Sequence, residues 1–229
     1  MPEPIHPSSP APPIPALIWH GKFGQLHDLL CSYAGEEADD EPGKPSRALT
    51  AYLRTMARTD SHAPAIAARQ AREVVHDGDL DSDTFIAIQY IMPRPVTTDE
   101  HTFFNWHRVV AALCDAAVET GLPKSVAVPE TAWEWRETFP GLFQLLACYL
   151  GQDFEGDTGD VDAAIEEWLS TAEPRSTAFV AGEVYHLLAL SLDRGELDDC
   201  LATLGLAAAL PWPAPNWLSG LGMRLFQQF

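Results

Sequence analysis

Residues 23–33 read Phe-Gly-Gln-Leu-His-Asp-Leu-Leu-Cys-Ser-Tyr, and this stretch carries the pattern that decides the fold class. Its apolar side chains fall at Leu26, Leu29, Leu30 and Tyr33, which is the i, i+3, i+4, i+7 spacing of one helical face. A helix with such a stripe buries it against other elements of the fold. The stretch therefore predicts an amphipathic helix that packs on a core.

Helical periodicity continues along the rest of the chain. No Asn-Gly or Asp-Gly turn sits between alternating, strand-like runs, so nothing predicts a β-hairpin. The short run 85–91 is the one segment that could form a strand instead. We therefore predict an all-α fold. The further helical stripes lie at 48–53, 65–75, 85–91 and 103–117.

The opening stretch recurs 116 positions later, where residues 139–149 read Phe-Pro-Gly-Leu-Phe-Gln-Leu-Leu-Ala-Cys-Tyr. Ten of 33 positions are identical between residues 23–55 and 139–171. The pair Asn105-Trp106 recurs as Asn216-Trp217, and we expect each Asn to cap the closing helix of its copy. Shared glycines and shared order go beyond the similarity of any two amphipathic helices, so the sequence predicts a tandem duplication.

The predicted architecture is two tandem five-helix bundle-like repeats packed together. Each copy alone is small for a stable core, which is why we expect them to pack. Seven prolines in the first 15 residues predict an extended tail, because proline fixes φ and removes a donor. The predicted segments are a Pro-rich tail at 1–16, a first helical repeat at 17–120, a linker at 121–135 and a second helical repeat at 136–229.

Charge and hydropathy exclude several classes of protein. The 229 residues include 33 Asp and Glu against 14 Lys and Arg, a net charge of −19, so we expect no direct binding to nucleic acid. No apolar run is long enough to span a membrane, and no secretory signal begins the chain, so we expect a cytoplasmic protein without membrane contact. The four cysteines form no Cys-x-x-Cys pair and are expected to be reduced core thiols.

The sequence contains no recognisable catalytic or metal-binding motif. It has no P-loop, no Gly-x-Ser-x-Gly and no His-Glu-x-x-His, so we predict that the protein is not an enzyme and needs no cofactor or metal. The acidic run 77–83 resembles the start of a calcium loop. It has Ser82 and Ile88 where that loop requires Gly and Glu, so a solvated helix-capping turn is the preferred interpretation.

Acidic loops at corresponding places in the two copies are the strongest functional signal. The span between Arg136 and Arg175 contains no Lys or Arg. A surface of this kind speeds the encounter with a basic partner. A merely solvated face and a DNA mimic are the alternatives. The carboxylates concerned are Glu36, Glu37, Asp39, Asp40 and Glu41 in the first copy and Asp153, Glu155, Asp157, Asp160 and Asp162 in the second.

Tryptophans provide a second signal. Trp133 and Trp135 lie in the predicted linker, and Trp212 lies among Pro211, Pro213 and Pro215. Tryptophan at the centre of an interface often dominates its binding energy, so an exposed anchor is one interpretation. Packing between the two copies is the other.

The second copy resembles the small bacterial immunity proteins of contact-dependent growth inhibition systems. The resemblance rests on the stretch 139–154, from Phe139-Pro-Gly-Leu to Asp153-Phe154, followed by Ala163-Ala-Ile-Glu-Glu-Trp-Leu, and it covers residues 136–229. The first copy is more degenerate, because Gly24 replaces the proline and Glu37 the aspartate. The resemblance implies a cytoplasmic antitoxin that binds a delivered toxin domain.

The resemblance and the charge together give the expected function. We expect an immunity protein that neutralises a cognate interbacterial toxin, with a basic, nuclease-like partner domain delivered by contact-dependent or type VI secretion. An acidic helical-repeat adaptor and a DNA-mimic binding protein stay open as alternatives. The expected toxin-binding residues are Glu37, Asp39, Asp40, Trp133, Trp135, Asp153, Glu155 and Asp157.

Overall fold

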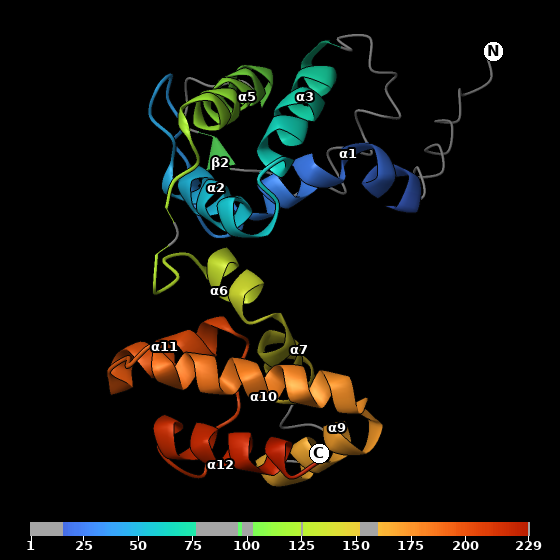
Figure 1. Cartoon of the computed structure of the whole chain (residues 1–229), viewed down its shortest axis with the longest axis vertical. Helices are drawn as coiled ribbons and strands as arrows, with labels where there is room; N and C mark the ends of the chain where they lie inside the picture. The colour runs from blue at the N-terminus through green and yellow to red at the C-terminus, as the bar shows by residue number, and fades with distance from the viewer. Residues whose placement is uncertain (1–15, 77–95, 98–102, 125, 152–159, 229) are drawn as a thin grey trace, which may run out of the picture. The chain divides into compact units, whose positions relative to one another are not determined.

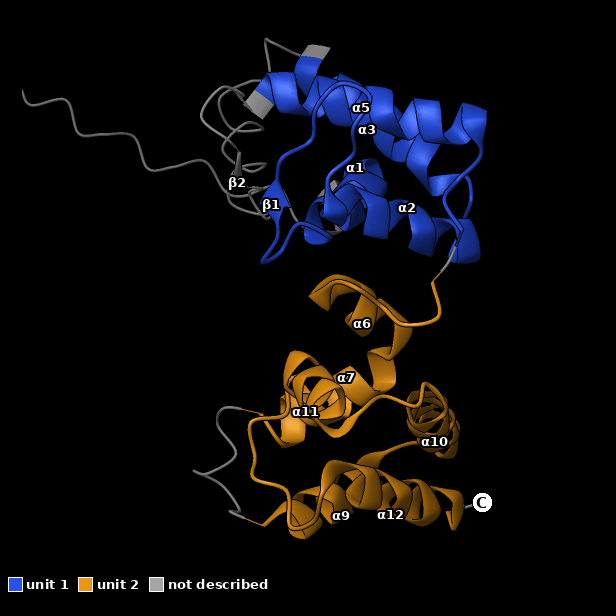
Figure 2. Ribbon diagram, turned by 90° about the vertical axis from the view of Figure 1, so that its left-hand side faces the viewer, with its two compact units in different colours: residues 1–125 blue, residues 126–229 orange. Residues whose placement is uncertain are grey.

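Helices make up nearly all the regular structure of the protein. The computed structural model describes residues 16–76, 96–97, 103–124, 126–151 and 160–228. In these ranges the elements are helices, apart from one pair of two-residue strands, so the all-α prediction is confirmed. The segment 85–91 lies outside the described residues. The chain divides into two units, residues 1–125 and 126–229 (Figure 2).

The first unit carries four described helices and the strand pair. In Figure 1, α3 and α5 lie side by side, and α1 also packs on α3. Strands β1 and β2 are parallel, with Glu37 opposite Val96. The elements are α1 (Ala16–Cys31), β1 (Glu37–Ala38), α2 (Arg47–Thr59), α3 (Ala63–His76), β2 (Val96–Thr97) and α5 (Phe103–Thr120).

The regular elements in the described part of the second unit are all helices. Its longest helix, α10, packs along α12 (Figure 1). Gly222 permits this close packing, because a Cβ there would lie 3.2 Å from the Tyr185 ring and 3.3 Å from Val184. The elements are α6 (Ala132–Thr138), α7 (Pro140–Tyr149), α9 (Val161–Thr171), α10 (Pro174–Ala189), α11 (Arg194–Thr203) and α12 (Ala214–Phe226).

The opening stripe of α1 is buried as its spacing predicts. Leu26, Leu29 and Leu30 each have 0% of their surface exposed, and Tyr33 has 3%. The helix is interrupted at Phe23, whose φ of −129° and ψ of 23° are not helical. The break turns the chain just before the buried stripe begins.

An equivalent break occurs 116 residues later. Phe139, with φ of −129° and ψ of 55°, separates α6 from α7, and Leu142, Leu145 and Leu146 of the stripe that follows it are fully buried. The helices before the two breaks begin at Ala16 and Ala132, which also differ by 116 positions. These paired features are what the tandem duplication predicts. The duplication itself stays a prediction.

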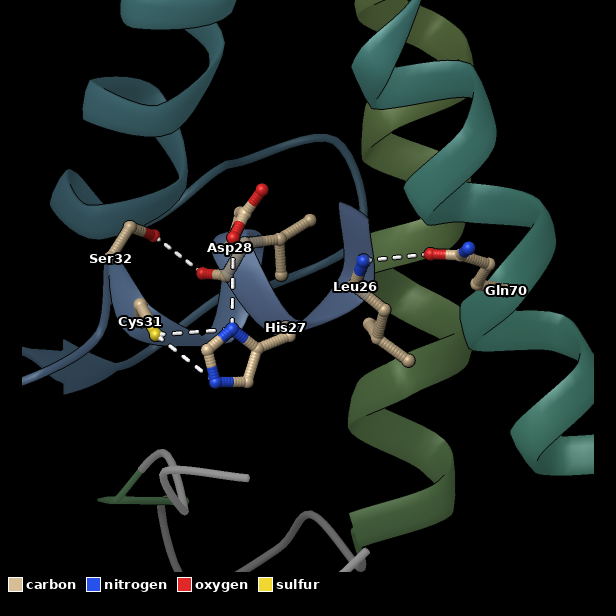
Figure 3. A network of polar contacts seen from close by, with 7 residues as sticks. Leu26, His27, Asp28, Cys31, Ser32 and Gln70 are labelled. Atoms are coloured by element: carbon tan, nitrogen blue, oxygen red, sulfur yellow. Dashed lines mark hydrogen bonds and ion pairs between the residues drawn. The ribbon is translucent and has the colours of Figure 1, made fainter. Parts of the chain in front are cut away.

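At both breaks a side chain from a later helix satisfies a backbone N–H that helix geometry leaves without a partner. The N–H of Leu26 donates to Oε1 of Gln70 at 2.8 Å (Figure 3). The N–H of Leu142, the counterpart of Leu26, donates to Oε2 of Glu183 at 2.5 Å. Gly141 N–H donates to the other Glu183 oxygen at 3.2 Å. The two units therefore solve the same local problem with an amide and with a carboxylate.

The helix caps agree with the sequence in one case and differ in another. Asp160 caps α9 and accepts from the N–H of Asp162 at 2.9 Å, which is the role that a carboxylate just before a helix favours. The expected caps Asn105 and Asn216 are wrong. α5 begins at Phe103, and α12 has Pro213 as its N-cap, so both asparagines lie inside the first turn of their helices.

Candidate protein-binding surfaces

The acidic loop of the first unit is organised around Asp40. Its carboxylate accepts from Tyr33 Oη at 2.8 Å, from the Ser46 backbone N–H at 2.7 Å and from Trp106 Nε1 at 3.1 Å. Only 1% of Asp40 is exposed, and the Trp106 ring lies edge-on to Tyr33 at 5.0 Å. The assignment of Asp40 to a toxin-binding surface is therefore wrong: this carboxylate ties the loop to α2 and α5.

The other predicted residues of this loop are accessible. Glu37, in β1, and Asp39 are both exposed. Glu36 lies 3.6 Å from Arg47 in an ion pair. Burial of Ala38 and Asp40 on alternate positions turns Glu37 and Asp39 outward, because successive side chains of an extended segment point to opposite sides. Glu37 and Asp39 thus form the exposed acidic edge of the loop.

The acidic loop of the second unit lies largely outside the described residues. This holds for Asp153, Glu155 and Asp157. The acidic side chains that follow are described: Asp162 and Glu166 accept from the two terminal nitrogens of the Arg224 guanidinium, each at 2.5 Å. α9 is thereby joined to α12 at the surface.

Trp133 and Trp135 lie on a helix rather than in an irregular linker. The short helix α6 is closed at its start by a reciprocal capping box between Thr131 and Glu134. Trp133 is only 7% exposed, which contradicts its assignment as an exposed anchor. Trp135 is half-buried and stacks on Phe139 with ring centroids 5.6 Å apart. The burial of Trp133 and the stacking of Trp135 on Phe139 favour a packing role for both indoles over binding to a partner protein.

Trp212 is the exposed tryptophan of the second unit, with 67% of its surface accessible. It follows Pro211 and precedes Pro213, which fix the backbone on both sides. Leu206 and Leu210, earlier in the same segment, are half-buried against the core of the unit. The prolines around Trp212 single it out in the sequence, but they do not show whether its side chain is exposed or buried.

The segment that carries Trp212 is anchored to the end of α7. Gly205 has φ of +95°, and a Cβ there would lie 2.8 Å from the Cβ of Ala147, so only glycine fits. The N–H groups of Ala207 and Ala208 both donate to the Leu150 carbonyl, at 2.9 and 3.1 Å. An anchored backbone presents the indole in one place at little entropic cost on binding.

The described residues contain no group of three His, Cys, Asp or Glu side chains placed to hold a metal ion. Cys31 Sγ lies 3.7 Å from His27 Nδ1 on the adjacent turn of α1 (Figure 3). Burial raises the pKa of the Cys114 and Cys200 thiols to about 12, so these two are protonated and poor nucleophiles at neutral pH. In the described part of the chain, no helix combines the length and hydropathy needed to cross a membrane.

The comparison with protein families gives a match inside the second unit, from the end of α6 to α12. Residues 138–225 match the CdiI immunity protein family. The resemblance of the second copy to these immunity proteins is therefore confirmed, and the matched stretch is called the immunity-family segment below. It contains Trp212, the Arg224 ion pairs and the Glu183 contact to α7. No curated protein and no solved structure matches the chain significantly.

Proposed function

We propose that this protein is an immunity protein that binds and neutralises a cognate interbacterial toxin. The observation that carries the proposal is the match of residues 138–225 to the CdiI immunity protein family. The protein acts by stoichiometric binding rather than by catalysis. It works in the cytoplasm of the cell that it protects, where the delivered toxin would otherwise act.

Charge supports a basic toxin domain, such as a nuclease with a substrate-binding face for phosphates. Residues 126–229 hold 16 Asp and Glu against 4 Lys and Arg, and the two arginines of α11 and α12 lie beside carboxylates. An acidic protein of this kind accelerates encounter with a basic domain, and the acceleration falls with added salt. The toxin would reach the cell by contact-dependent or type VI secretion.

The acidic loops are the proposed electrostatic part of the interface. Glu37 and Asp39 in the first unit and Asp153, Glu155 and Asp157 in the second are the residues we expect to steer the toxin. Asp40 is excluded because it is 1% exposed and holds three hydrogen bonds inside its unit.

A charge-reversal experiment on the full chain tests the electrostatic part. The variant carries lysine at Asp153, Glu155 and Asp157. Its association rate constant with the purified toxin domain should fall by about tenfold or more at low salt, with an unchanged melting temperature. A control variant reverses three carboxylates of the first unit outside the acidic loop: Asp60 and Glu119, which are exposed, and Glu73, which is partly exposed.

The control separates a local effect from a general loss of negative charge. Both variants change the net charge equally, so the control should slow association by less than about threefold. Equal slowing in the two variants would contradict the assignment of Asp153, Glu155 and Asp157 to the interface. Unchanged affinity of the first variant would move the interface elsewhere on the molecule.

A further inference from the structure

The anchored loop before α12 separates two hollows in the surface of the second unit, and Trp212 lines both. One hollow, of about 450 Å³, lies against α11 and includes Asp198 and Leu201 in its walls. The other, of about 490 Å³, lies against α12 and includes Gly220 and Met223. A two-thirds exposed indole between two hollows can be inserted into a partner while parts of the partner fill the spaces beside it.

One face of α12 forms the floor of the second hollow. Asn216, Gly220 and Met223 recur at i, i+4 and i+7 and therefore share this face. Met223 is 59% exposed. We call Trp212 together with these three residues the Trp212 surface.

Gly220 has no role in the packing of the unit. A Cβ at this position would meet no atom within 4 Å, and the backbone is ordinary α-helix. Glycine disfavours a helix interior relative to alanine, so its presence here weakens α12 without any gain inside the chain. A glycine on the floor of a hollow lets a partner approach the helix backbone closely.

The charges around the two hollows indicate what kind of partner fits. Arg224 lies in ion pairs with Asp162 and Glu166 at one hollow, and Arg194 lies 3.8 Å from Asp198 at the other. The basic side chains there are thus already balanced, while the unit as a whole carries four times as many acidic as basic residues. The complementary partner is a basic protein domain with an apolar pocket for an indole.

We propose that the Trp212 surface is the apolar centre of the toxin-binding site, with Trp212 as its anchor. The proposal rests on the proposed function, because it takes the basic partner to be the cognate toxin domain. The acidic residues around the surface accelerate the encounter, and the inserted indole slows dissociation. The residues concerned lie within the immunity-family segment.

Full-length variants test the proposal against the C-terminal domain of the protein encoded by the neighbouring gene, which is taken as the cognate toxin domain and is purified after co-expression with the wild-type chain. Trp212→Ala should weaken binding by at least about 30-fold, mainly through faster dissociation. Gly220→Ala should leave folding unchanged or slightly more stable yet weaken binding by about fivefold or more, because its methyl group narrows the hollow. A purely structural role would not produce stability and affinity changes of opposite sign.

Matched controls come from α10. Gly182 is a second helical glycine whose Cβ would meet nothing within 4 Å, and Phe179 is 55% exposed. Gly182→Ala and Phe179→Ala should change affinity by less than about threefold. If Trp212→Ala binds the toxin domain as tightly as the wild type, or if only the α10 variants lose binding, the Trp212 surface is not the binding site. Either result would leave the proposed immunity function standing. Absence of binding by the wild-type chain would overturn both proposals.

Discussion

Asp40 belongs to a run of acidic residues that the sequence assigns to the surface, yet in the structure it is a buried hydrogen-bond acceptor of the first unit. Three donors from three parts of the first unit converge on its carboxylate, at Tyr33, Ser46 and Trp106. The Asp40→Ala variant leaves all three donors without their acceptor in a buried place. We expect its free energy of unfolding to fall by about 2–4 kcal/mol.

The neighbouring residue is the matched control for this prediction. Asp39 is exposed, so Asp39→Ala should change stability by less than about 0.5 kcal/mol. Urea denaturation of the full chain, followed by near-ultraviolet circular dichroism, measures both variants. Equal stability of Asp40→Ala and Asp39→Ala would contradict the structural role of Asp40.

The sequence could not distinguish Asp40 from its acidic neighbours. Its decisive partner, Trp106, is 66 positions away, and local pattern says nothing of such a contact. The run of five carboxylates between 36 and 41 therefore looked uniform. The helical stripe predicts that Tyr33 lies in the core. The spacing of residues along the sequence does not show which group accepts the hydrogen bond from its hydroxyl.

At the scale of the element, α7 is held at its first turn by Glu183 of α10. Burial raises the pKa of Glu183, and the hydrogen bonds from Leu142 and Gly141 lower it, with a net rise. A carboxyl group whose pKa is higher in the folded state stabilises the fold fully below its ordinary pKa, and this contribution declines as pH rises through the folded pKa. Glutamine cannot titrate.

The stability of Glu183→Gln relative to the wild type should therefore improve as pH rises above the ordinary glutamate pKa of 4.5. Gln70 fills the corresponding place in the first unit, where its Nε2 donates to the Lys22 carbonyl, whereas Glu183 accepts from both Leu142 and Gly141. Glutamine at position 183 therefore gives up the hydrogen bond from Gly141, a cost that does not vary with pH. Glu183→Ala should lose about 1–3 kcal/mol, because the buried N–H of Leu142 then lacks an acceptor. Urea denaturation at several pH values gives the three curves, and a difference between Glu183→Gln and wild type that does not vary with pH would refute this assignment.

The sequence predicted most elements but not how they begin and end. The stripe at Leu26, Leu29 and Leu30 gave the buried face of α1 correctly. The stripe did not predict the break at Phe23, because a phenylalanine does not by itself indicate an interruption of a helix. In the second unit Pro140 marks the start of α7. The seven residues of α6 are too few to show a helical period in the sequence.

At the scale of the whole molecule, the two units share a pattern of breaks and buried stripes at an offset of 116 residues. This is the pattern that a tandem duplication predicts, while the family match covers the second unit alone. The residue pattern of the second copy thus predicted the family correctly, whereas the exposure of Trp212 cannot be read from its neighbouring prolines.

Growth rescue is the measurement that tests the central claim most directly. The C-terminal domain of the protein encoded by the neighbouring gene, taken as the candidate toxin domain, is expressed in a naive host with and without this full-length chain. Our account predicts growth arrest by the toxin domain alone, rescue when the chain is present, and a 1:1 complex on co-purification. Growth arrest that persists with the chain present, together with the absence of a complex, would contradict the claim that this protein is the immunity partner of that toxin.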